Sequence, residues 1–238
     1  MEKDYLIAGL RVRMDTYGRT EKQAQAYEVE KNGKPDILIH SDAWYLKEVQ
    51  PDLEEETCEY IATGVDFFRK LLPFDALMLH SSAVVKDGYA YLFSAPCGTG
   101  KSTHTSLWQE AFGAENALIL NDDKPILRLE DGHWYAYGSP WSGKTSLNIN
   151  MRVPVGGICM LNRGESNKIV PHCGARATME LLDQTSRIGN EKYLGKLLEL
   201  VDKVLADIPV WKLYCTPTVD AAIVSHKAMA EEAKKRFG

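Results

Sequence analysis

The stretch from Ser94 to Ser102 has the sequence SAPCGTGKS and contains residue types that bind phosphate groups. Its small residues let backbone N–H groups surround phosphate oxygens, and a helix that begins at its end would add the positive end of its dipole. In this pattern Lys101 supplies charge to the β- and γ-phosphates, and the Ser102 hydroxyl is a ligand for Mg²⁺. The stretch predicts a phosphate-binding loop made of Pro96, Cys97, Gly98, Thr99, Gly100, Lys101, Ser102 and Thr103.

The segments on either side of this loop agree with that prediction. The apolar run Tyr89–Phe93 predicts a buried strand, and residues 103–108 can continue as a helix. A strand, a glycine-containing loop and a helix form the arrangement that a phosphate loop requires. Ala95 departs from the usual G-x-x-x-x-G-K-S/T pattern, and alanine fits there only if the position does not need a positive φ. The alternative is a chance Gly-Lys-Ser in an ordinary loop.

Two adjacent acids follow the next apolar run. Residues 117–120 predict a short strand, which ends in Asn121-Asp122-Asp123. The chain between Lys101 and this strand is long enough for one crossover helix between parallel strands. Carboxylates at the carboxyl end of such a strand would lie beside the phosphate loop. One could bind Mg²⁺ and the other could take a proton from an attacking hydroxyl; the alternative is an ordinary acidic turn before Lys124.

Together with a histidine ahead of the loop, His80, these motifs resemble the catalytic core of HPr kinase/phosphorylase, which is related to ATP-dependent phosphoenolpyruvate carboxykinase. The resemblance covers about residues 75–165 and rests on Leu79–Val85, Gly88, Phe93–Pro96, Gly98–Ser102 and Asn121–Asp123. It implies an α/β P-loop kinase core with a mixed sheet and flanking helices. It also implies binding of ATP and Mg²⁺ and phosphoryl transfer to a hydroxyl. Asp122 would be the base, Asp123 would assist the metal, and His80 would lie near the transferring phosphate.

The resemblance leaves the acceptor open. Thr103 stands where HPr kinases carry an acidic residue, and the stretch that recognises HPr is not recognisable. The chain is most similar to short, stand-alone HPr-kinase-like proteins, several of which accompany peptide-modification systems in bacteria. The acceptor could therefore be a serine of a peptide or protein, or a small hydroxyl compound. Three alternatives stay open: a carboxykinase-like lyase, a non-catalytic nucleotide-binding regulator, and phosphorolysis of a phosphoserine.

A further motif reads YGSPWSGK at residues 137–144, and it is similar to a run in the same short proteins. Trp141 and Lys144 could face the nucleotide or the acceptor, unless Trp141 simply anchors a structural loop. Arg152 and Arg163 flank an apolar strand and could stabilise charge on the γ-phosphate, although such arginines are more often surface charges. His104, two residues after Ser102, is expected to be a partly exposed helix residue rather than a nucleotide contact.

Composition sets limits on this interpretation. A net charge of −5 without a long basic run argues against nucleic-acid binding. No apolar stretch is long enough to span a membrane, and the start lacks a signal-peptide pattern. The five scattered cysteines favour reduced thiols and a cytoplasmic protein. Cys97 is either a redox-sensitive thiol or a small filler residue. The resembled kinases assemble into oligomers, but no sequence feature shows a homo-oligomer here.

The 238 residues predict a single domain, in which residues 1–73 form strands and a helix packed on a catalytic core of residues 74–238. Short strands are expected at residues 5–12, 26–29 and 36–40, with Asn32-Gly33 as a hairpin turn. Residues 54–72 predict a helix, residues 76–161 are strand-rich, and hairpin turns are expected at residues 86–88 and 130–132. Helices follow from Ala177, interrupted by a strand at residues 210–215, and the last helix spans residues 221–237.

Overall fold

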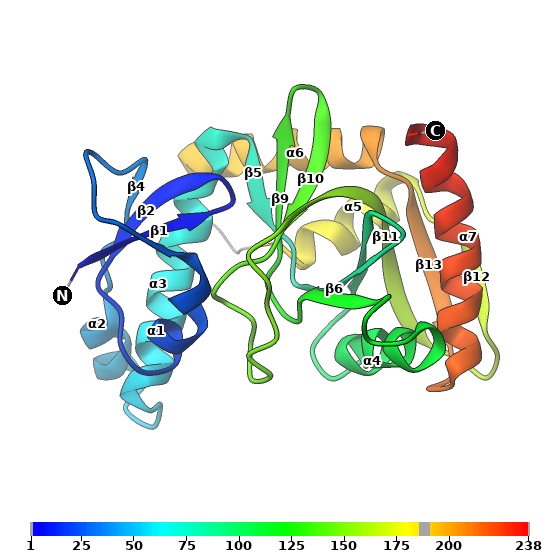
Figure 1. Ribbon diagram of the computed structural model, residues 1–238, viewed down its shortest axis with the longest axis horizontal. Helices are drawn as coiled ribbons and strands as arrows, with labels where there is room; N and C mark the ends of the chain where they lie inside the picture. Colours follow the sequence, from blue (N-terminus) through cyan, green and yellow to red (C-terminus); the bar gives the residue numbers. More distant parts are fainter. Residues whose placement is uncertain (1, 186–190, 238) are drawn as a thin grey trace.

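A computed structural model describes residues 2–185 and 191–237, with a small sheet at one end of the molecule and a larger sheet filling the rest (Figure 1). The small sheet begins with a hairpin of β1 (Lys3–Ile7) and β2 (Leu10–Met14). Ala8 and Gly9 form its turn with φ values of 52° and 73°. The prediction of one strand over residues 5–12 is wrong, because the apolar alternation continues through this two-residue turn.

The outer strands of the small sheet are β3 (Glu28–Val29) and β4 (Ile37–Leu38), in the order β3-β1-β2-β4. They lie on opposite edges, so the prediction that Asn32-Gly33 joins two strands as a hairpin is wrong. Instead, the connection crosses the buried carboxylate of Asp4, which accepts hydrogen bonds from Arg13 Nε (2.7 Å) and Arg11 Nη1 (3.1 Å). The same two guanidinium groups donate to backbone carbonyls of the connection, which fixes its path.

Three helices complete this N-terminal module: α1 (Gly18–Ala24), α2 (Ala43–Val49) and α3 (Glu55–Leu71). The predicted helix over residues 54–72 is confirmed as α3, which buries Phe67, Phe68 and Leu71. A 3₁₀ turn that contains Pro73 follows it, as expected for a residue that cannot continue a helix. The sequence patterns do not predict the two short helices α1 and α2.

The larger sheet is mixed and has nine strands. Its central strand β11 (Arg152–Arg163) runs parallel to β7 (Tyr89–Ser94) and to β13 (Val210–Cys215), while the other pairings are antiparallel. Two of the three predicted hairpin turns, those in the larger sheet, are confirmed, because Asp87-Gly88 and Asp131-Gly132 all have positive φ. The remaining strands are β5 (Ala76–Met78), β6 (Ser81–Lys86), β8 (Leu118–Asn121), β9 (Ile126–Glu130), β10 (His133–Tyr137) and β12 (Lys168–Pro171).

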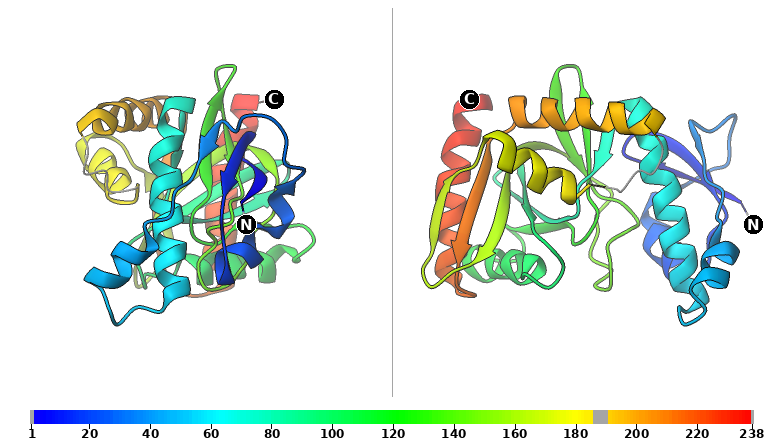
Figure 2. Two further views of the ribbon diagram at one scale, coloured as in Figure 1. Left: turned by 90° about the vertical axis from the view of Figure 1, so that its left-hand side faces the viewer. Right: turned by 180° about the vertical axis from the view of Figure 1, so that it is seen from behind.

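Helices cover both faces of this sheet (Figures 1 and 2). Successive side chains of a strand point to opposite faces, and on β7 Leu92 belongs to one buried cluster while Phe93 belongs to the other. The cluster with Leu92 packs against α5 (Gly174–Asp183) and α6 (Glu191–Asp207), and the cluster with Phe93 packs against α4 (Lys101–Phe112) and α7 (Val219–Phe237). The expected α/β fold with a mixed sheet and flanking helices is therefore present.

A third buried cluster joins the N-terminal module to the larger sheet. It combines the apolar side chains of the small sheet and α3 with Met78, Ile126, Tyr137 and Trp141. The module therefore rests on the β5–β9–β10 side of the large sheet through side chains that are out of contact with water. Among the described residues, no helix has both the length and the apolar character needed to cross a membrane.

Candidate active site

The segment 95–100, which we call the glycine loop, joins the end of β7 to the start of α4. Gly98 and Gly100 have φ values of 78° and 120°, and a Cβ atom on either would meet nothing within 4 Å. These glycines therefore permit the sharp turn and border open space. Ala95 is fully buried and does not have a positive φ, so alanine fits at the position where the sequence pattern usually has glycine.

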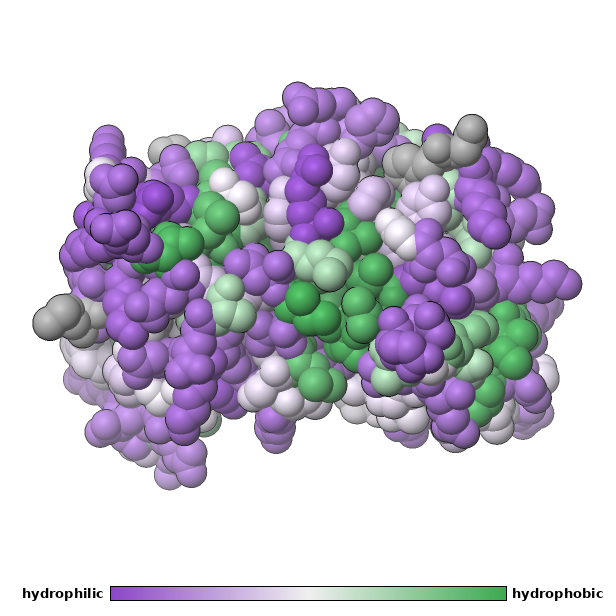
Figure 3. Space-filling view, in the orientation of Figure 1, coloured by the Kyte–Doolittle hydropathy of each residue, from purple (hydrophilic) through white to green (hydrophobic). Residues whose placement is uncertain are grey.

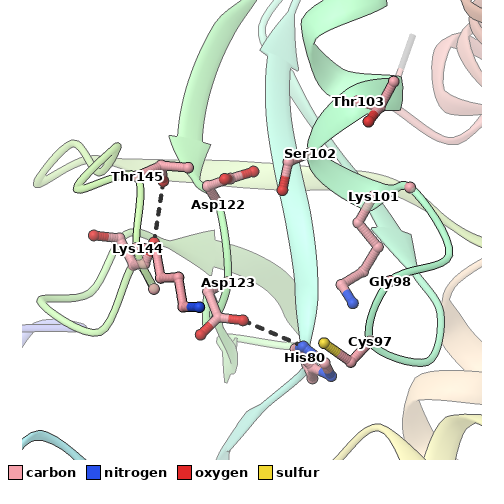
Figure 4. A pocket seen from close by; sticks show the side chains of 13 residues that line it. His80, Cys97, Gly98, Lys101, Ser102, Thr103, Asp122, Asp123, Lys144 and Thr145 are labelled. Carbon is pink, nitrogen blue, oxygen red and sulfur yellow. Dashed lines mark hydrogen bonds and ion pairs between the residues drawn. The ribbon is translucent and has the colours of Figure 1, made fainter. Parts of the chain in front are cut away.

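A cavity of about 520 Å³ opens beside the glycine loop (Figure 4). Cys97, Gly98, Gly100 and the first residues of α4 line one wall. Residues 142–145 line the opposite wall, and His80, Asp122 and Asp123 lie between the two. Of the residues predicted to hold phosphate, Pro96 and Thr99 do not line the cavity; they form the turn of the loop, in which Thr99 N–H donates to the Pro96 carbonyl (3.3 Å).

Both acids reach the cavity because β8 ends beside the glycine loop. As expected, β8 runs parallel to β7, but β6 lies between them and is antiparallel to both. The side-chain oxygen of Asn121 accepts hydrogen bonds from the backbone N–H groups of Asp123 (2.9 Å) and Lys124 (2.7 Å). This turn fixes the backbone that presents the two carboxylates.

Asp122 is almost completely buried, and its carboxylate is held by two hydroxyl groups in series. Ser82 Oγ donates to Asp122 Oδ1 (2.7 Å), and Ser82 Oγ also lies 2.7 Å from Thr105 Oγ1 on α4. Figure 4 shows the Asp122 carboxylate turned toward Ser102. Strand β6 and helix α4 therefore both fix this acid at the start of the helix.

Asp123 lies between the side chains of His80 and Lys124. Its Oδ1 is 3.2 Å from His80 Nε2, and its Oδ2 pairs with the ammonium group of Lys124. Burial disfavours the charged carboxylate, but the hydrogen bond from His80 and the charge of Lys124 outweigh burial and lower the pKa of Asp123 to about 2. His80 is in turn held by Gln184, whose Oε1 lies 3.1 Å from His80 Nδ1. Asp123 is thus an ionised carboxylate throughout the physiological pH range.

Lys101 is the first residue of α4 and is 8% exposed. Its ammonium group donates to the carbonyl of Ala95 (2.8 Å), so the side chain lies along the inside of the glycine loop. Burial lowers the pKa of Lys101, and the nearby charge of Asp123 opposes this shift. The lysine therefore lies at the cavity wall with its side-chain nitrogen bound to a backbone carbonyl of the glycine loop.

Trp141 does not line the cavity. Its ring is fully buried, stacks on Phe67 with a centroid distance of 4.7 Å, and donates from Nε1 to Thr63 Oγ1 (3.3 Å). The tryptophan anchors its loop to α3, which agrees with the structural alternative and not with a nucleotide contact. Lys144, three residues later, is exposed and lines the cavity.

We call residues 142–147 the lysine loop, and two residues of the N-terminal module hold it. The Tyr60 hydroxyl accepts a hydrogen bond from Gly143 N–H (2.8 Å), and Gln23 Nε2 donates to the Gly143 carbonyl (2.9 Å). Gly143 has a φ of 72°, and a Cβ there would lie 3.0 Å from Asp123 Cβ. Glycine therefore lets this loop approach the acid closely. No motif in the sequence points to Gln23 or Tyr60.

The two arginines have different surroundings. Arg152 pairs with Glu130 (2.8 Å) and lies over the Tyr135 ring, outside the cavity. Arg163 donates from Nη2 to the carbonyl of Gly98 (2.8 Å), so it contacts the back of the glycine loop. Only Arg163 is therefore brought next to the predicted phosphate-binding residues.

Comparisons with known proteins give matches among solved structures. No protein-family profile matches the chain, and no curated protein matches it. Among solved structures, the HPr(Ser) kinase/phosphatase from Coxiella burnetii matches with a TM-score of 0.40 and 11% sequence identity. The match covers 68% of this chain and 99% of that one. The similarity is too distant to assign an activity or a substrate to this chain.

Proposed function

We propose that the protein is a kinase that transfers the γ-phosphoryl group of ATP to a hydroxyl acceptor and uses Mg²⁺. The proposal rests on one observation: a single cavity is lined by glycines of the glycine loop, by the buried Lys101 and by two carboxylates that lie between its walls. Phosphoryl transfer needs mainly positioning and neutralisation of charge, together with a group that accepts the proton of the attacking hydroxyl.

The glycine-loop side of the cavity fits a triphosphate. Gly98 and Gly100 border open space, so backbone N–H groups can approach phosphate oxygens without a side chain between them. The N-terminus of α4 adds its dipole at the same place. Lys101 would release the Ala95 carbonyl and donate its hydrogen bonds to phosphate oxygens instead.

The carboxylate side fits Mg²⁺. Among the described residues, no group of three or more His, Cys, Asp and Glu side chains could hold a metal ion by itself. Mg²⁺ bound to substrate phosphates needs only one or two protein carboxylates, with water completing its shell. Ser102 and Asp123 would be its ligands, because Asp123 stays ionised. Asp122, oriented by Ser82, would take the proton of the hydroxyl acceptor.

The test uses the full chain with labelled ATP, Mg²⁺ and a panel of serine or threonine peptides and small hydroxyl compounds. Asp122→Asn should still bind ATP but transfer phosphate about 10²–10⁴-fold more slowly, the usual contribution of a general base. Asp123→Asn should raise the Mg²⁺ concentration needed for half-maximal rate. Asp131→Asn, in the β9–β10 turn, is the matched control and should behave as wild type.

The other outcomes separate the alternatives. If Asp123→Asn abolishes transfer while Asp122→Asn only shifts the Mg²⁺ requirement, the two acids have exchanged roles. If the wild-type chain binds ATP but no compound is phosphorylated, a nucleotide-binding regulator is favoured. ATP-dependent conversion of oxaloacetate would instead indicate a carboxykinase-like lyase. If the protein does not bind ATP, the proposal is wrong.

A further inference from the structure

The lysine loop carries a hydroxyl-bearing residue that lines the same cavity as the two acids. Thr145 lines this cavity together with Lys101 and Asp122, and its side chain is exposed. A phosphoryl group is transferred in line, so the attacking oxygen must come from the side opposite the leaving oxygen of ADP. The phosphates would lie on the glycine loop, and Thr145 lies on the opposite wall. It is therefore on the side from which an acceptor must approach.

The backbone holds Thr145 close to Asp122. The Leu147 carbonyl accepts a hydrogen bond from Asp122 N–H (3.1 Å), and residues 147–149 continue antiparallel to the end of β8. On the other side of Thr145, Gly143 is bound to the N-terminal module through both its N–H and its carbonyl. Figure 4 shows the Thr145 side chain next to Asp122. The threonine is therefore anchored from both sides, beside the acid proposed as the base.

The residue after Thr145 has a backbone conformation that residues with a Cβ atom rarely adopt. Ser146 has a φ of 56°, and Gln23 Nε2 donates a hydrogen bond to the Ser146 hydroxyl (3.0 Å). Such a conformation is unfavourable and persists only where the surrounding structure holds it, which is common at functional sites. The N-terminal module therefore helps to fix the loop conformation in which Thr145 lines the cavity.

The hydroxyl group of Thr145 is only weakly engaged by the protein. It donates to the Ser142 carbonyl (3.2 Å), and it accepts from Leu147 N–H over 3.4 Å. Both distances are long for hydrogen bonds of these types. Because the side chain is exposed, rotation about χ1 can turn the hydroxyl toward Asp122 without disturbing the packing of the core.

The other hydroxyl groups at the cavity are less suited to attack a phosphate. Ser102 and Thr103 lie at the start of α4, on the wall that would hold the phosphates. Ser142 is fully buried, and its Oγ accepts a hydrogen bond from Asn148 Nδ2 (2.9 Å). Among the described residues that line the cavity, Thr145 is therefore the exposed hydroxyl on the acceptor side.

We propose that the kinase phosphorylates its own Thr145. The Thr145 oxygen attacks the γ-phosphorus of ATP, the bond from this phosphorus to the β,γ-bridging oxygen breaks, and ADP leaves. The hydroxyl proton goes to Asp122, and the new phosphate ester lies beside Lys144, which compensates its charge. The proposal rests on the proposed function. It goes further because it names one acceptor hydroxyl and makes the lysine loop a site of covalent modification.

The experiment incubates the full chain with ATP and Mg²⁺, without an added acceptor, and locates phosphate by mass spectrometry of its peptides. A single phosphate per chain is expected, on Thr145. Thr145→Ala should remove it, Thr145→Ser should keep it, and Asp122→Asn should slow its formation about 10²–10⁴-fold, the usual contribution of a general base. Thr178→Ala, at an exposed position of α5, is the matched control and should be labelled as wild type is.

Two further measurements show whether the transfer occurs within one molecule. The rate of labelling per chain should not change with protein concentration. A mixture of Thr145→Ala, which keeps the base, and Asp122→Asn, which keeps the acceptor, should not be labelled faster than Asp122→Asn alone. A rate that rises with concentration, or faster labelling in the mixture, would show that the hydroxyl comes from a second molecule and would contradict the inference. Thermal unfolding and calorimetry with ATP show that each variant is folded and binds the nucleotide.

The remaining outcomes separate this inference from the proposed function. If the wild-type protein binds ATP but carries no phosphate on Thr145, the inference is wrong; phosphorylation of a compound from the panel would then leave the proposed function standing. Phosphate that stays at the wild-type level in Thr145→Ala would also contradict the inference, because another residue would be the acceptor. If the wild-type protein does not bind ATP, both claims are wrong.

Discussion

The two walls of the site cavity are built in different ways. The glycine loop connects β7 to α4, which follow each other in the chain and belong to the central sheet and a helix packed on it. The lysine loop is held from outside this sheet, by Tyr60 across 83 residues and by Gln23 across 120 residues of sequence. One wall is therefore part of the core, while the other depends on the N-terminal module.

This difference predicts that the two walls have different functions. The glycine loop should bind the nucleotide whether or not the lysine loop is in place. The two elements that hold it, β7 and α4, pack against each other in the same buried cluster. The lysine loop, which brings Lys144 and Gly143 next to Asp123, should mainly affect the position of the acceptor and the transferring phosphate. Mutations in the two walls should therefore separate ATP binding from turnover.

The largest effect is expected from breaking the glycine-loop wall with Lys101→Met. The substitution removes a buried cation that lines the phosphate side of the cavity. Turnover should fall about a thousandfold, similar to the loss of one strong transition-state donor in other enzymes, and ATP should bind more weakly. Steady-state ATP consumption and calorimetry measure both. Lys227→Met, at an exposed position of α7, is the control; a rate within about tenfold of wild type would contradict the assignment.

A smaller effect, on stability, is expected from Trp141→Ala. The substitution removes a fully buried ring that stacks on Phe67 and connects the lysine loop to α3. It should lower the free energy of unfolding by about 3 kcal/mol, as other buried aromatic truncations do. Denaturant titration measures this loss. Trp44→Ala, whose side chain is 69% exposed, should change stability little. Equal losses in the two variants would show that Trp141 is not an anchor.

The free energy of unfolding should also depend on pH, because the N-terminal module buries Glu59, the neighbour of Tyr60 on α3. Burial raises the pKa of Glu59 to about 7, while Thr20, whose hydroxyl donates to the carboxylate, opposes the shift. The folded state thus favours the protonated acid, so this contribution to stability is complete below the ordinary carboxyl pKa of 4.5 and is lost as the pH rises through 7. The free energy of unfolding should fall by roughly 2 kcal/mol over this range.

Glu59→Gln provides the comparison for that pH dependence. Glutamine has nearly the same shape and cannot titrate, so the variant should show a much flatter stability profile between pH 4.5 and pH 8 when unfolding is followed by circular dichroism. Glu48→Gln, on the short helix α2, is the matched surface control and should keep the wild-type slope. A wild-type profile in Glu59→Gln would show that another group is responsible.

The same comparison explains how far the sequence could be interpreted. The glycine loop, the Asp pair and the hairpin turns at Asp87-Gly88 and Asp131-Gly132 were predictable because each depends on a few adjacent residues and on backbone conformations that glycine and aspartate favour. The supports of the lysine loop were not, because a Gln and a Tyr far away in the chain have no spacing that relates them to Gly143. Trp141 shows the same limit, since its type fits a ligand contact as well as a buried anchor.

His104 shows why burial is harder to predict than position. The prediction that it is partly exposed is wrong, since it is only 3% exposed. Its place after Ser102 is evident from the sequence, but α4 has no strongly apolar stripe at this residue, and its exposure depends on α7, which begins 115 residues later. Likewise, the alternation from Tyr5 to Val12 continues across a turn because Ala8 and Gly9 are small and apolar. Packing between distant segments decides such cases, and local patterns do not contain that information.

The smallest and most specific effect is expected from Tyr60→Phe in the lysine-loop wall. The Gly143 N–H group loses its acceptor, while Gln23 still holds the Gly143 carbonyl, so the loop should loosen without detaching. We expect the rate of phosphoryl transfer to fall about tenfold and the Kd for ATP to stay within about twofold, because the glycine loop is untouched. Tyr45→Phe, 56% exposed on α2, is the control. If Tyr60→Phe weakens ATP binding as much as it slows turnover, the two walls are not independent, and the N-terminal module supports nucleotide binding as well.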